Sequence, residues 1–271
     1  LEKHISPRTK AIIPVHLYGQ PVVMEPIWDL AKKHNLFILE DAAPSIGSLY
    51  KGKKTGNLGH AAAFSFQGAK AVVTGEGGFL VTNDEELKNR AYFINDHGRD
   101  PSRTLYNIEI GYKYKMSNIQ AALGLAQMQK AEQIVEQKRQ IFSWYQDRLG
   151  DIDELSLNIE RPETRNIFWM SSLVLGDQIK FERDEFITEL KKRMIDSRPM
   201  FHPMSGFPMF DSADNPVAYS IPMRGINLPS GHARTEEEID YVCAHIRDLL
   251  GKDIGKCAKL QPQGCLAFRD E

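Results

Sequence analysis

The fold is decided by Leu36-Phe37-Ile38-Leu39-Glu40-Asp41-Ala42-Ala43, an apolar run that ends in two acids and two alanines. A short run of consecutive apolar residues is typical of a strand that is buried on both faces of a parallel sheet. The stretch before it, Met24 to Lys33, has apolar residues at helical spacing, and Ala11 to Leu17 is a second apolar run. Strand, helix and strand in this order predict a βαβ unit.

The same alternation continues on the C-terminal side of this unit. Ala62 to Phe66 and Gly78 to Thr82 are predicted strands. Asn83-Asp84-Glu85-Glu86 is typical of a helix start, with a cap and acids in the first turn. Strands that alternate with helices predict an α/β fold, with a mainly parallel sheet in a three-layer sandwich.

A long helical pattern from Ser117 to about Leu149 predicts one helix that links two parts of the chain. Beyond Gly150 we expect a smaller α+β unit, with a strand around 168–175 and helices over 182–194 and 235–250. The expected organisation is a large domain over 1–125, the linking helix and a small C-terminal domain over 126–250, and a loose tail over 251–271.

Composition excludes several classes of protein. The chain has 271 residues, of which 34 are Lys or Arg and 36 are Asp or Glu, so its formal net charge is −2. A chain so close to neutrality does not bind nucleic acid through its overall field. No stretch reaches the roughly 20 apolar residues that span a bilayer, and no secretion leader is visible. The three cysteines form no CxxC pair, so we expect reduced thiols, no metal site and a cytoplasmic location.

Three residues near the predicted strand ends have side chains suited to catalysis. Asp41 ends a strand where α/β sheets bind ligands; it either pairs with a protonated ring nitrogen or a ribose hydroxyl, or only caps a turn. Lys70, which precedes the glycine-rich stretch 74–78, is either a Schiff-base amine or a solvated surface charge. The Ser65 hydroxyl either binds a phosphate or satisfies the backbone. Taken singly, the three residues leave these alternatives open.

Taken together, these residues carry a resemblance to a known family. The chain resembles the DegT/DnrJ/EryC1/StrS family of pyridoxal phosphate-dependent sugar aminotransferases in Glu40-Asp41-Ala42-Ala43, Phe64-Ser65-Phe66, Lys70 and Gly75-Glu76-Gly77-Gly78. Further segments agree in the same order, namely Ile13 to Gly19, Val81 to Asp84 and Gly111 to Ala122. The resemblance covers about residues 1 to 250.

The resemblance implies a fold type I aminotransferase with pyridoxal 5'-phosphate as cofactor. Lys70 matches the lysine that holds the cofactor covalently and moves a proton between substrate and cofactor, and Asp41 matches the acid that keeps the pyridine nitrogen protonated. Ala43 would pack under the ring, and Ser65 matches a hydroxyl that binds the cofactor phosphate. Lys113 lies where the family often has an Asn that reaches the phosphate from the neighbouring subunit, which implies a homodimer with a shared active site.

The chain departs from the family pattern in two places. Pro44 stands where the family commonly has Gln or another polar residue near the ring hydroxyl, and proline cannot make that contact. The first strand matches a segment well inside the family's fold, so we expect about a hundred N-terminal residues, a small domain, to be missing. Related sugar dehydratases have His at the position of Lys70, so the lysine favours transamination, with glutamate as the expected amino donor.

The expected substrate is a nucleotide-linked 4-keto-6-deoxyhexose that is aminated at C4. The segments 168–170, 197–204 and 227–231 look most like the branch of the family with that activity. Arg198 is the candidate for binding the nucleotide phosphates, and His202 for binding the sugar or the phosphates. The alternatives are an ordinary surface ion pair for Arg198 and a histidine held in a turn for His202.

Other functions remain as alternatives. The chain is alternatively a truncated, non-catalytic relative with a structural or regulatory role, whose unpaired strands would recruit another chain. A nicotinamide-dependent oxidoreductase is disfavoured, because no GxGxxG follows an early strand. Binding of nucleic acid has no clustered basic helix to support it.

Overall fold

The computed structural model describes residues 1–254. Most of the tail predicted over 251–271 lies outside the described residues, as do Cys257 and Cys265. The chain divides into two compact units. Within the described residues the N-terminal unit comprises 1–134 and 160–167, and the C-terminal unit comprises 135–159 and 168–254. Each unit is described by itself.

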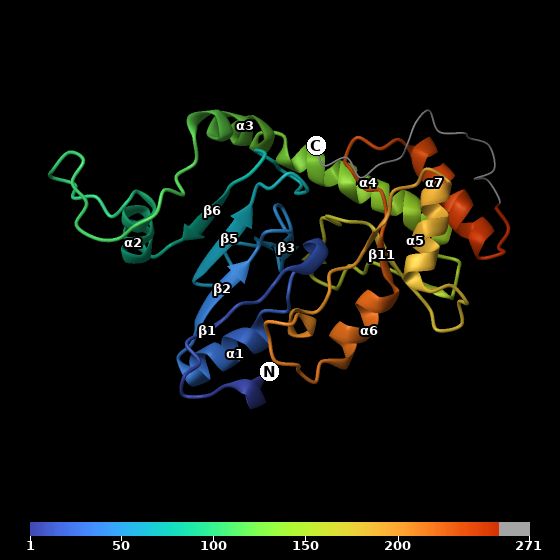
Figure 1. Ribbon diagram of the computed structural model, residues 1–271, viewed down its shortest axis with the longest axis horizontal. Coiled ribbons are helices and arrows are strands. Elements are labelled where there is room, and N and C mark those ends of the chain that lie inside the picture. The colour runs from blue at the N-terminus through green and yellow to red at the C-terminus, as the bar shows by residue number, and fades with distance from the viewer. Residues whose placement is uncertain (255–271) are drawn as a thin grey trace. The chain divides into compact units, whose positions relative to one another are not determined.

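The N-terminal unit is built on a four-stranded sheet of order β1-β2-β5-β6 (Figure 1). The strands of this unit are β1 (Ala11–Ile12), β2 (Phe37–Asp41), β3 (Leu49–Tyr50), β4 (Lys53–Lys54), β5 (Ala61–Ser65), β6 (Gly78–Thr82) and β8 (Thr164–Arg165). Its helices are α1 (Glu25–His34), α2 (Glu85–Asn95) and α3 (Asn118–Met128), with 3-10 turns at Glu2–His4 and Leu17–Gly19. β1, β2 and β5 are parallel and β6 is antiparallel to β5, which confirms the predicted mainly parallel sheet. β3, β4 and β8 form a second, small sheet.

Local signals explain where these elements begin and end. α1 has a proline in its first turn, and it ends before Asn35, which adopts the left-handed conformation with φ 52°. Asp84 caps α2 as predicted, because its side chain accepts a hydrogen bond from the Leu87 N–H at 3.0 Å. Ile38, in the middle of β2, is fully buried in a cluster with Met24 and other apolar residues of α1 and the following loops.

The long helix predicted from Ser117 to Leu149 is two helices, which corrects that prediction. α3 ends at Met128, and α4 (Ala131–Leu149) begins three residues later. At the join the Lys130 N–H donates to the Gln127 carbonyl, three residues back, at 2.9 Å, so the chain turns more tightly than an α-helix there. Apolar spacing continues on both sides of this turn, which is why the pattern alone did not reveal the break.

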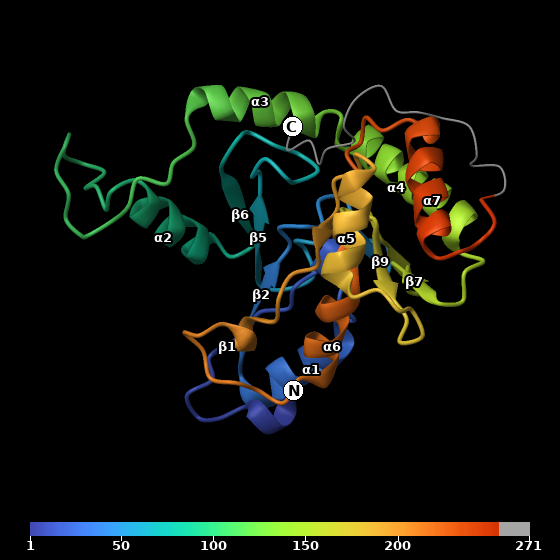
Figure 2. The ribbon, with the colours of Figure 1, turned by 45° about the vertical axis from the view of Figure 1, so that its right-hand side comes forward.

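The C-terminal unit is a small α+β structure, as predicted (Figure 2). Its antiparallel sheet has the order β10-β11-β9-β7, from β7 (Leu155–Leu157), β9 (Ser172–Leu175), β10 (Arg198–Pro199) and β11 (Gly225–Asn227). Most of α4 belongs to this unit, with α5 (Arg183–Lys192), α6 (Pro216–Arg224), α7 (Glu236–Leu249) and a 3-10 turn at Met204–Gly206. One apolar core joins α4, α5 and α7 to the sheet, and Tyr145 and Phe186 are fully buried in it. Thr235 caps α7 in a capping box with Glu238, as its sequence predicted.

None of the helices within residues 1–254 is both long enough and apolar enough to cross a membrane. Over the same residues, no three His, Cys, Asp or Glu side chains gather in a way that would hold a metal ion.

Candidate active site

The carboxyl ends of β2 and β5 lie side by side and carry three of the predicted cofactor residues. In this parallel pair Asp41 lies opposite Ala63, and Ser65 follows two residues later at the end of β5. Because residues two apart on a strand share a face, the side chains of Asp41 and Ser65 lie on the same face of the sheet. Ala43, half-buried, follows β2 directly, and the preceding N–H, that of Ala42, donates to the Ala63 carbonyl at 2.9 Å.

The backbone at Asp41 is held on both sides. Its N–H donates to the Pro14 carbonyl at 2.9 Å, and its carbonyl accepts from the His16 N–H at 3.1 Å. Its carboxylate Oδ1 accepts from the Ala43 N–H at 3.1 Å. Among the described residues no hydrogen bond uses its other oxygen, Oδ2. Asp41 is therefore a turn acid, and its second carboxylate oxygen leaves the ligand-binding interpretation open.

Lys70 lies in the loop between β5 and β6, next to the strand end that carries Ser65. The loop closes on itself, because the Phe66 N–H donates to the Gly77 carbonyl at 2.9 Å. Within it the Lys70 N–H donates to the Gln67 carbonyl at 2.9 Å, and the Ser65 hydroxyl oxygen accepts from the Gln67 N–H at 3.2 Å. Ser65 and Lys70 are thus tied through the same turn residue.

A glycine is needed where this loop rejoins the sheet. Gly78 lies opposite Ser65 in the β5–β6 pair, and a Cβ atom there would lie 2.3 Å from the Phe64 carbonyl oxygen. Since no real Cβ approaches so closely, Gly78 allows β6 to lie against the end of β5. The glycine-rich stretch seen in the sequence therefore fixes the loop that holds Lys70.

Burial lowers the pKa of the Lys70 amine below its ordinary value of 10.5, and the negative charge of Asp41 opposes that change. The two side chains therefore lie close enough for their charges to interact. A half-buried lysine whose pKa is lowered holds its proton less tightly than a surface lysine does. This environment favours the Schiff-base amine over the solvated surface charge.

A buried charge that the sequence analysis did not assign lies on the opposite face of β2. Glu40, fully buried, directs its carboxylate away from Asp41, because adjacent residues on a strand point to opposite faces. Its Oε1 accepts from the N–H groups of Leu58 at 2.7 Å and Gly59 at 2.6 Å. Its Oε2 accepts from the Gly56 N–H at 2.7 Å and from the His16 ring at 2.9 Å.

His16 connects Glu40 to the chain that precedes Asp41. Its Nδ1 accepts from the Val22 N–H at 3.1 Å, so the ring proton is on Nε2, which donates to Glu40. Burial alone would raise the pKa of Glu40, but the hydrogen bonds from His16 and the three N–H groups bring it below 4.5. The first of the two acids that end this apolar strand was the available sequence signal for this pair.

The residues at this edge fit pyridoxal phosphate. Lys70 supplies a desolvated amine, Asp41 a carboxylate with a free oxygen, and Ser65 a hydroxyl whose proton remains to be donated. Ala43 adds only a methyl group, which leaves room for a flat ring. These are the groups that a pyridine nitrogen, an aldehyde carbon and a phosphate require.

Lys113 lies on another element of the N-terminal unit, and Arg198 and His202 belong to the C-terminal unit. Lys113 is exposed on the segment between α2 and α3, where its backbone forms a bridge with Asp96, and no contact joins it to the four residues above within the described chain. Pro44 is buried. Arg198 and His202 are both exposed. Arg198 pairs with Asp196 at 3.1 Å, the surface ion pair that the sequence left as an alternative.

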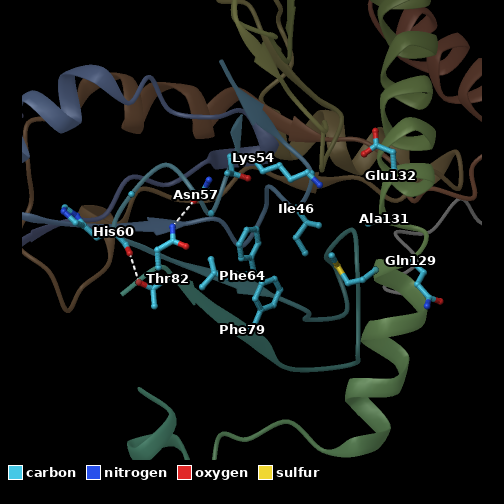
Figure 3. A pocket seen from close by; sticks show the side chains of 17 residues that line it. Ile46, Lys54, Asn57, His60, Phe64, Phe79, Thr82, Gln129, Ala131 and Glu132 are labelled. Carbon is cyan, nitrogen blue, oxygen red and sulfur yellow. Dashed lines mark hydrogen bonds between the residues drawn. The ribbon is translucent and has the colours of Figure 1, made fainter. Parts of the chain in front are cut away.

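A cavity of 450 Å³ in the N-terminal unit is not this site (Figure 3). Phe64 and Phe79 line it, and their rings stack with centroids 4.7 Å apart. Since Phe64 is adjacent to Ser65 on β5, its ring lies on the face opposite the hydroxyl. None of Asp41, Ser65 and Lys70 lines the cavity, so the residues suited to chemistry lie on the other side of the sheet.

Comparison with known proteins agrees with this geometry. The profile of the DegT/DnrJ/EryC1/StrS aminotransferase family matches residues 1–247. Over 257 residues the chain is 40% identical to a GDP-perosamine synthase of Caulobacter vibrioides, covering 92% of this chain and 68% of that protein. A GDP-perosamine synthase of Escherichia coli O157:H7 is 38% identical over 250 residues, with the same two coverages.

Solved structures give the same answer for the fold. Helicobacter pylori PseC, an aminotransferase involved in the biosynthesis of pseudoaminic acid, superposes with a TM-score of 0.88 at 26% identity, over 93% of this chain and 69% of that one. Its fold is the fold type I architecture expected from the sequence. The chain therefore belongs to the DegT/DnrJ/EryC1/StrS family of pyridoxal phosphate-dependent sugar aminotransferases.

Proposed function

We propose that this protein transfers an amino group from glutamate to C4 of a nucleotide-linked 4-keto-6-deoxyhexose, as a GDP-perosamine synthase does. The similarity to two GDP-perosamine synthases, at 40% and 38% identity, supports the substrate class. The observation that carries the proposal is that the half-buried Lys70 amine lies close enough to Asp41 for their charges to interact, beside the paired strand ends that carry Asp41 and Ser65.

Each residue of the site has a separate task in this proposal. Bound pyridoxal phosphate supplies an electron sink for the carbon from which a proton is removed. Lys70 holds the cofactor and moves that proton, for which a lysine with a lowered pKa is suited. Asp41 holds the proton of the ring nitrogen through its free oxygen. Ser65 donates to the phosphate, and Ala43 lies under the ring.

The identity of residue 70 separates two reactions. Lysine at this position holds and releases the cofactor in turn, so an amino group can be collected from glutamate and passed on. The related dehydratases with histidine do not hold the cofactor in this way. Lys70 therefore favours amino transfer. The alternative of a non-catalytic relative is not favoured, because Asp41, Ser65 and Lys70 are assembled at one edge.

We assign cofactor binding to the large domain over 1–125 and selection of the nucleotide sugar to the domain over 126–250. Arg198, exposed on β10, offers a guanidinium to the phosphates, and His202 lies four residues later in an exposed segment. In its pair with the half-buried Asp196 the Arg198 guanidinium is exposed, so a phosphate can replace the aspartate at little cost.

The proposal includes a homodimer. α3 and the segment before it expose a run of large apolar side chains, namely Leu105, Tyr106, Ile108, Ile110, Tyr112, Tyr114, Ile119, Leu123 and Leu125. Ile110 is 90% exposed and Ile119 is 77% exposed. Such a surface favours contact with a second copy of the chain, and Lys113 on the same segment would then reach the partner's cofactor phosphate. Sedimentation at micromolar concentration is expected to give a dimer, and Ile110→Asp with Ile119→Asp a monomer.

Turnover tests the reaction directly. The protein loaded with pyridoxal phosphate is incubated with glutamate and GDP-4-keto-6-deoxymannose, and the sugar product is followed by mass spectrometry. We expect the 4-amino sugar from the wild type and none from Lys70→Ala. Lys88→Ala, which removes an exposed lysine of α2, is the control. Product from Lys70→Ala at the wild-type rate would contradict the role of Lys70, and turnover only with another nucleotide sugar would correct the substrate.

A further inference from the structure

Lys138 of α4 is a buried cation in the C-terminal unit that the proposed reaction does not use. Lys138 is 6% exposed, and its ammonium donates to the carbonyls of Trp169 and Ser230, both at 2.9 Å. Among the described residues no carboxylate pairs with it. A buried ammonium is costly, and an apolar side chain of the same length would fill the space without that cost. The amine is therefore needed for the two carbonyls that it holds.

The two carbonyls belong to the segments that flank the β9–β11 pair. Trp169 lies before β9 and Ser230 after β11, where the Leu228 N–H donates to the Ser171 carbonyl at 2.8 Å. Lys138 joins the two segments from α4 at this point, and the Ser171 N–H adds a bond to the Ser230 hydroxyl at 3.3 Å.

A second residue of α4 supports the same segment. Tyr145 lies seven residues, or two turns, after Lys138, so both side chains project from one face of the helix. Its hydroxyl donates to the Pro229 carbonyl at 2.8 Å. Successive carbonyls, of Pro229 and Ser230, are thus fixed from one helix, which leaves the backbone of this segment little freedom.

Trp169 connects these buried hydrogen bonds to an exposed segment of the C-terminal unit. Its ring, 3% exposed, stacks on the ring of Phe201 with centroids 6.1 Å apart. Phe201 is 52% exposed and directly precedes His202, three residues after Arg198. Contacts therefore run from the buried ammonium to Trp169, to Phe201, and to the segment proposed to bind the nucleotide sugar.

We infer that Lys138 is a positioning residue for sugar-nucleotide binding, acting through Trp169 and Phe201 on the segment 198–202. The inference rests on the proposed function, since that function assigns the nucleotide sugar to this segment. A positioning role of this kind affects only one half of the reaction, the half with the nucleotide sugar, and not the half with glutamate. Loss of the Lys138 ammonium should weaken binding of the nucleotide sugar and leave the reaction with glutamate unchanged.

The test compares Lys138→Met, Lys138→Arg and wild type, all full-length and loaded with pyridoxal phosphate. Lys192→Met removes an exposed lysine of α5 that pairs with Glu189, and it is the matched control. Three quantities are measured: the Kd for GDP-mannose by calorimetry, the rate of the spectral change on adding glutamate, and hydrogen exchange of the amides of 198–204 by mass spectrometry.

For Lys138→Met we expect a Kd about tenfold higher, because two hydrogen bonds to a charged group are lost, and faster exchange over 198–204. The glutamate rate should match wild type. Lys138→Arg should restore binding in part, and Lys192→Met should match wild type throughout. Unchanged Kd and exchange in Lys138→Met would overturn the inference, and so would an equal loss in the glutamate rate, which would indicate a general structural defect.

Two further outcomes are decisive. If the wild type itself does not bind GDP-mannose, the proposed substrate is wrong, and exchange over 198–204 alone then decides whether Lys138 positions that segment. If Lys138→Met does not fold, Phe201→Ala removes the exposed end of the same chain of contacts. It should raise the Kd for GDP-mannose, and a wild-type Kd would overturn the inference.

Discussion

Each of the two units buries a charged side chain that only hydrogen bonds to the protein support, Glu40 in one and Lys138 in the other, and the two are accommodated differently. In the N-terminal unit Glu40 accepts hydrogen bonds from three backbone N–H groups and from His16. In the C-terminal unit Lys138 donates to two backbone carbonyls. Hydrogen bonds bring the pKa of Glu40 below 4.5 despite its burial, whereas burial lowers the pKa of Lys138 to about 8. Hydrogen bonds therefore fully offset the cost of burying the Glu40 carboxylate, but they do not fully offset the cost of burying the Lys138 ammonium.

The difference matches what each charge holds. Glu40 lies beside Asp41 on β2 and fixes the strand end that carries the candidate cofactor residues, so we expect its charge to persist at neutral pH. Lys138 holds two segments of the C-terminal unit, where a neutral amine can still donate to both carbonyls. The buried charge is thus constant beside the proposed cofactor site and titratable in the unit proposed to bind the nucleotide sugar. The following predictions test that contrast.

The largest effect is expected on removing the buried anion. Glu40→Ala leaves three N–H groups and His16 without their acceptor, which should lower the free energy of unfolding by about 3–5 kcal/mol. Urea denaturation at pH 7 measures it, with Glu85→Ala, an exposed acid of α2, as control. Because the folded-state pKa of Glu40 is below the unfolded value, wild type keeps this stability above pH 4.5 and loses it as pH falls through the folded pKa. If Glu40→Ala lowered the free energy of unfolding by less than about 1 kcal/mol, Glu40 would not differ from Lys138 in the way described.

Asp41, the neighbour of Glu40, should affect rate and not stability. Asp41→Asn keeps the hydrogen bond to the Ala43 N–H but removes the charge, so the rate of the glutamate reaction should fall on the order of a hundredfold. Stopped-flow absorbance measures this rate, and Asp29→Asn on α1 is the control. An unchanged rate would show that Asp41 is only the turn acid.

Lys138 should give a stability that rises with pH. Between pH 8 and 10.5 the unfolded chain keeps the Lys138 proton that the folded chain has lost, so the unfolded state binds more protons and the free energy of unfolding increases with pH. The difference between wild type and Lys138→Met should grow in favour of wild type by up to about 1.4 kcal/mol per pH unit. Urea midpoints from pH 7.5 to 9.5 measure it, and subtraction of the variant cancels all other titrating groups. If the difference in unfolding free energy did not change with pH, the hydrogen bonds to Lys138 would offset its burial as fully as those to Glu40 do.

The smallest effect on stability is expected at Arg198. Its side chain is exposed in its ion pair with Asp196, so Arg198→Ala should change the free energy of unfolding by less than about 0.5 kcal/mol. Calorimetric binding of GDP-mannose should nevertheless weaken. If this variant bound GDP-mannose with full affinity, Arg198 would form only a surface ion pair and would not bind the nucleotide sugar.

Sequence patterns predicted most of the fold, since the strands that carry the site are short apolar runs with clear ends. β6 begins and ends at the predicted residues, and β2 and β5 differ from prediction by one or two. The break between α3 and α4 was missed, because a tight turn from Gln127 to Lys130 leaves the apolar spacing intact. The brevity of β1 was missed as well, since Pro14 interrupts an otherwise apolar run.

The site was predictable where a motif names the residue. Lys70, Asp41, Ala43 and Ser65 came from ordered motifs, and the strand register then brings Asp41 and Ser65 to one face. The roles of Glu40 and Lys138 depend on partners that are backbone groups far away in the sequence, such as the Gly59 N–H and the Ser230 carbonyl. Side-chain patterns carry no information on which backbone groups will be near, so these two charges required the structure.

The central claim is that Lys70 is the amine that holds the cofactor. The direct measurement is to add pyridoxal phosphate to the purified protein, record the visible spectrum, reduce with borohydride and map the labelled peptide. We expect a visible band that borohydride removes and a single label on Lys70. No bound cofactor, or a label spread over exposed lysines such as Lys33 and Lys88, would contradict it.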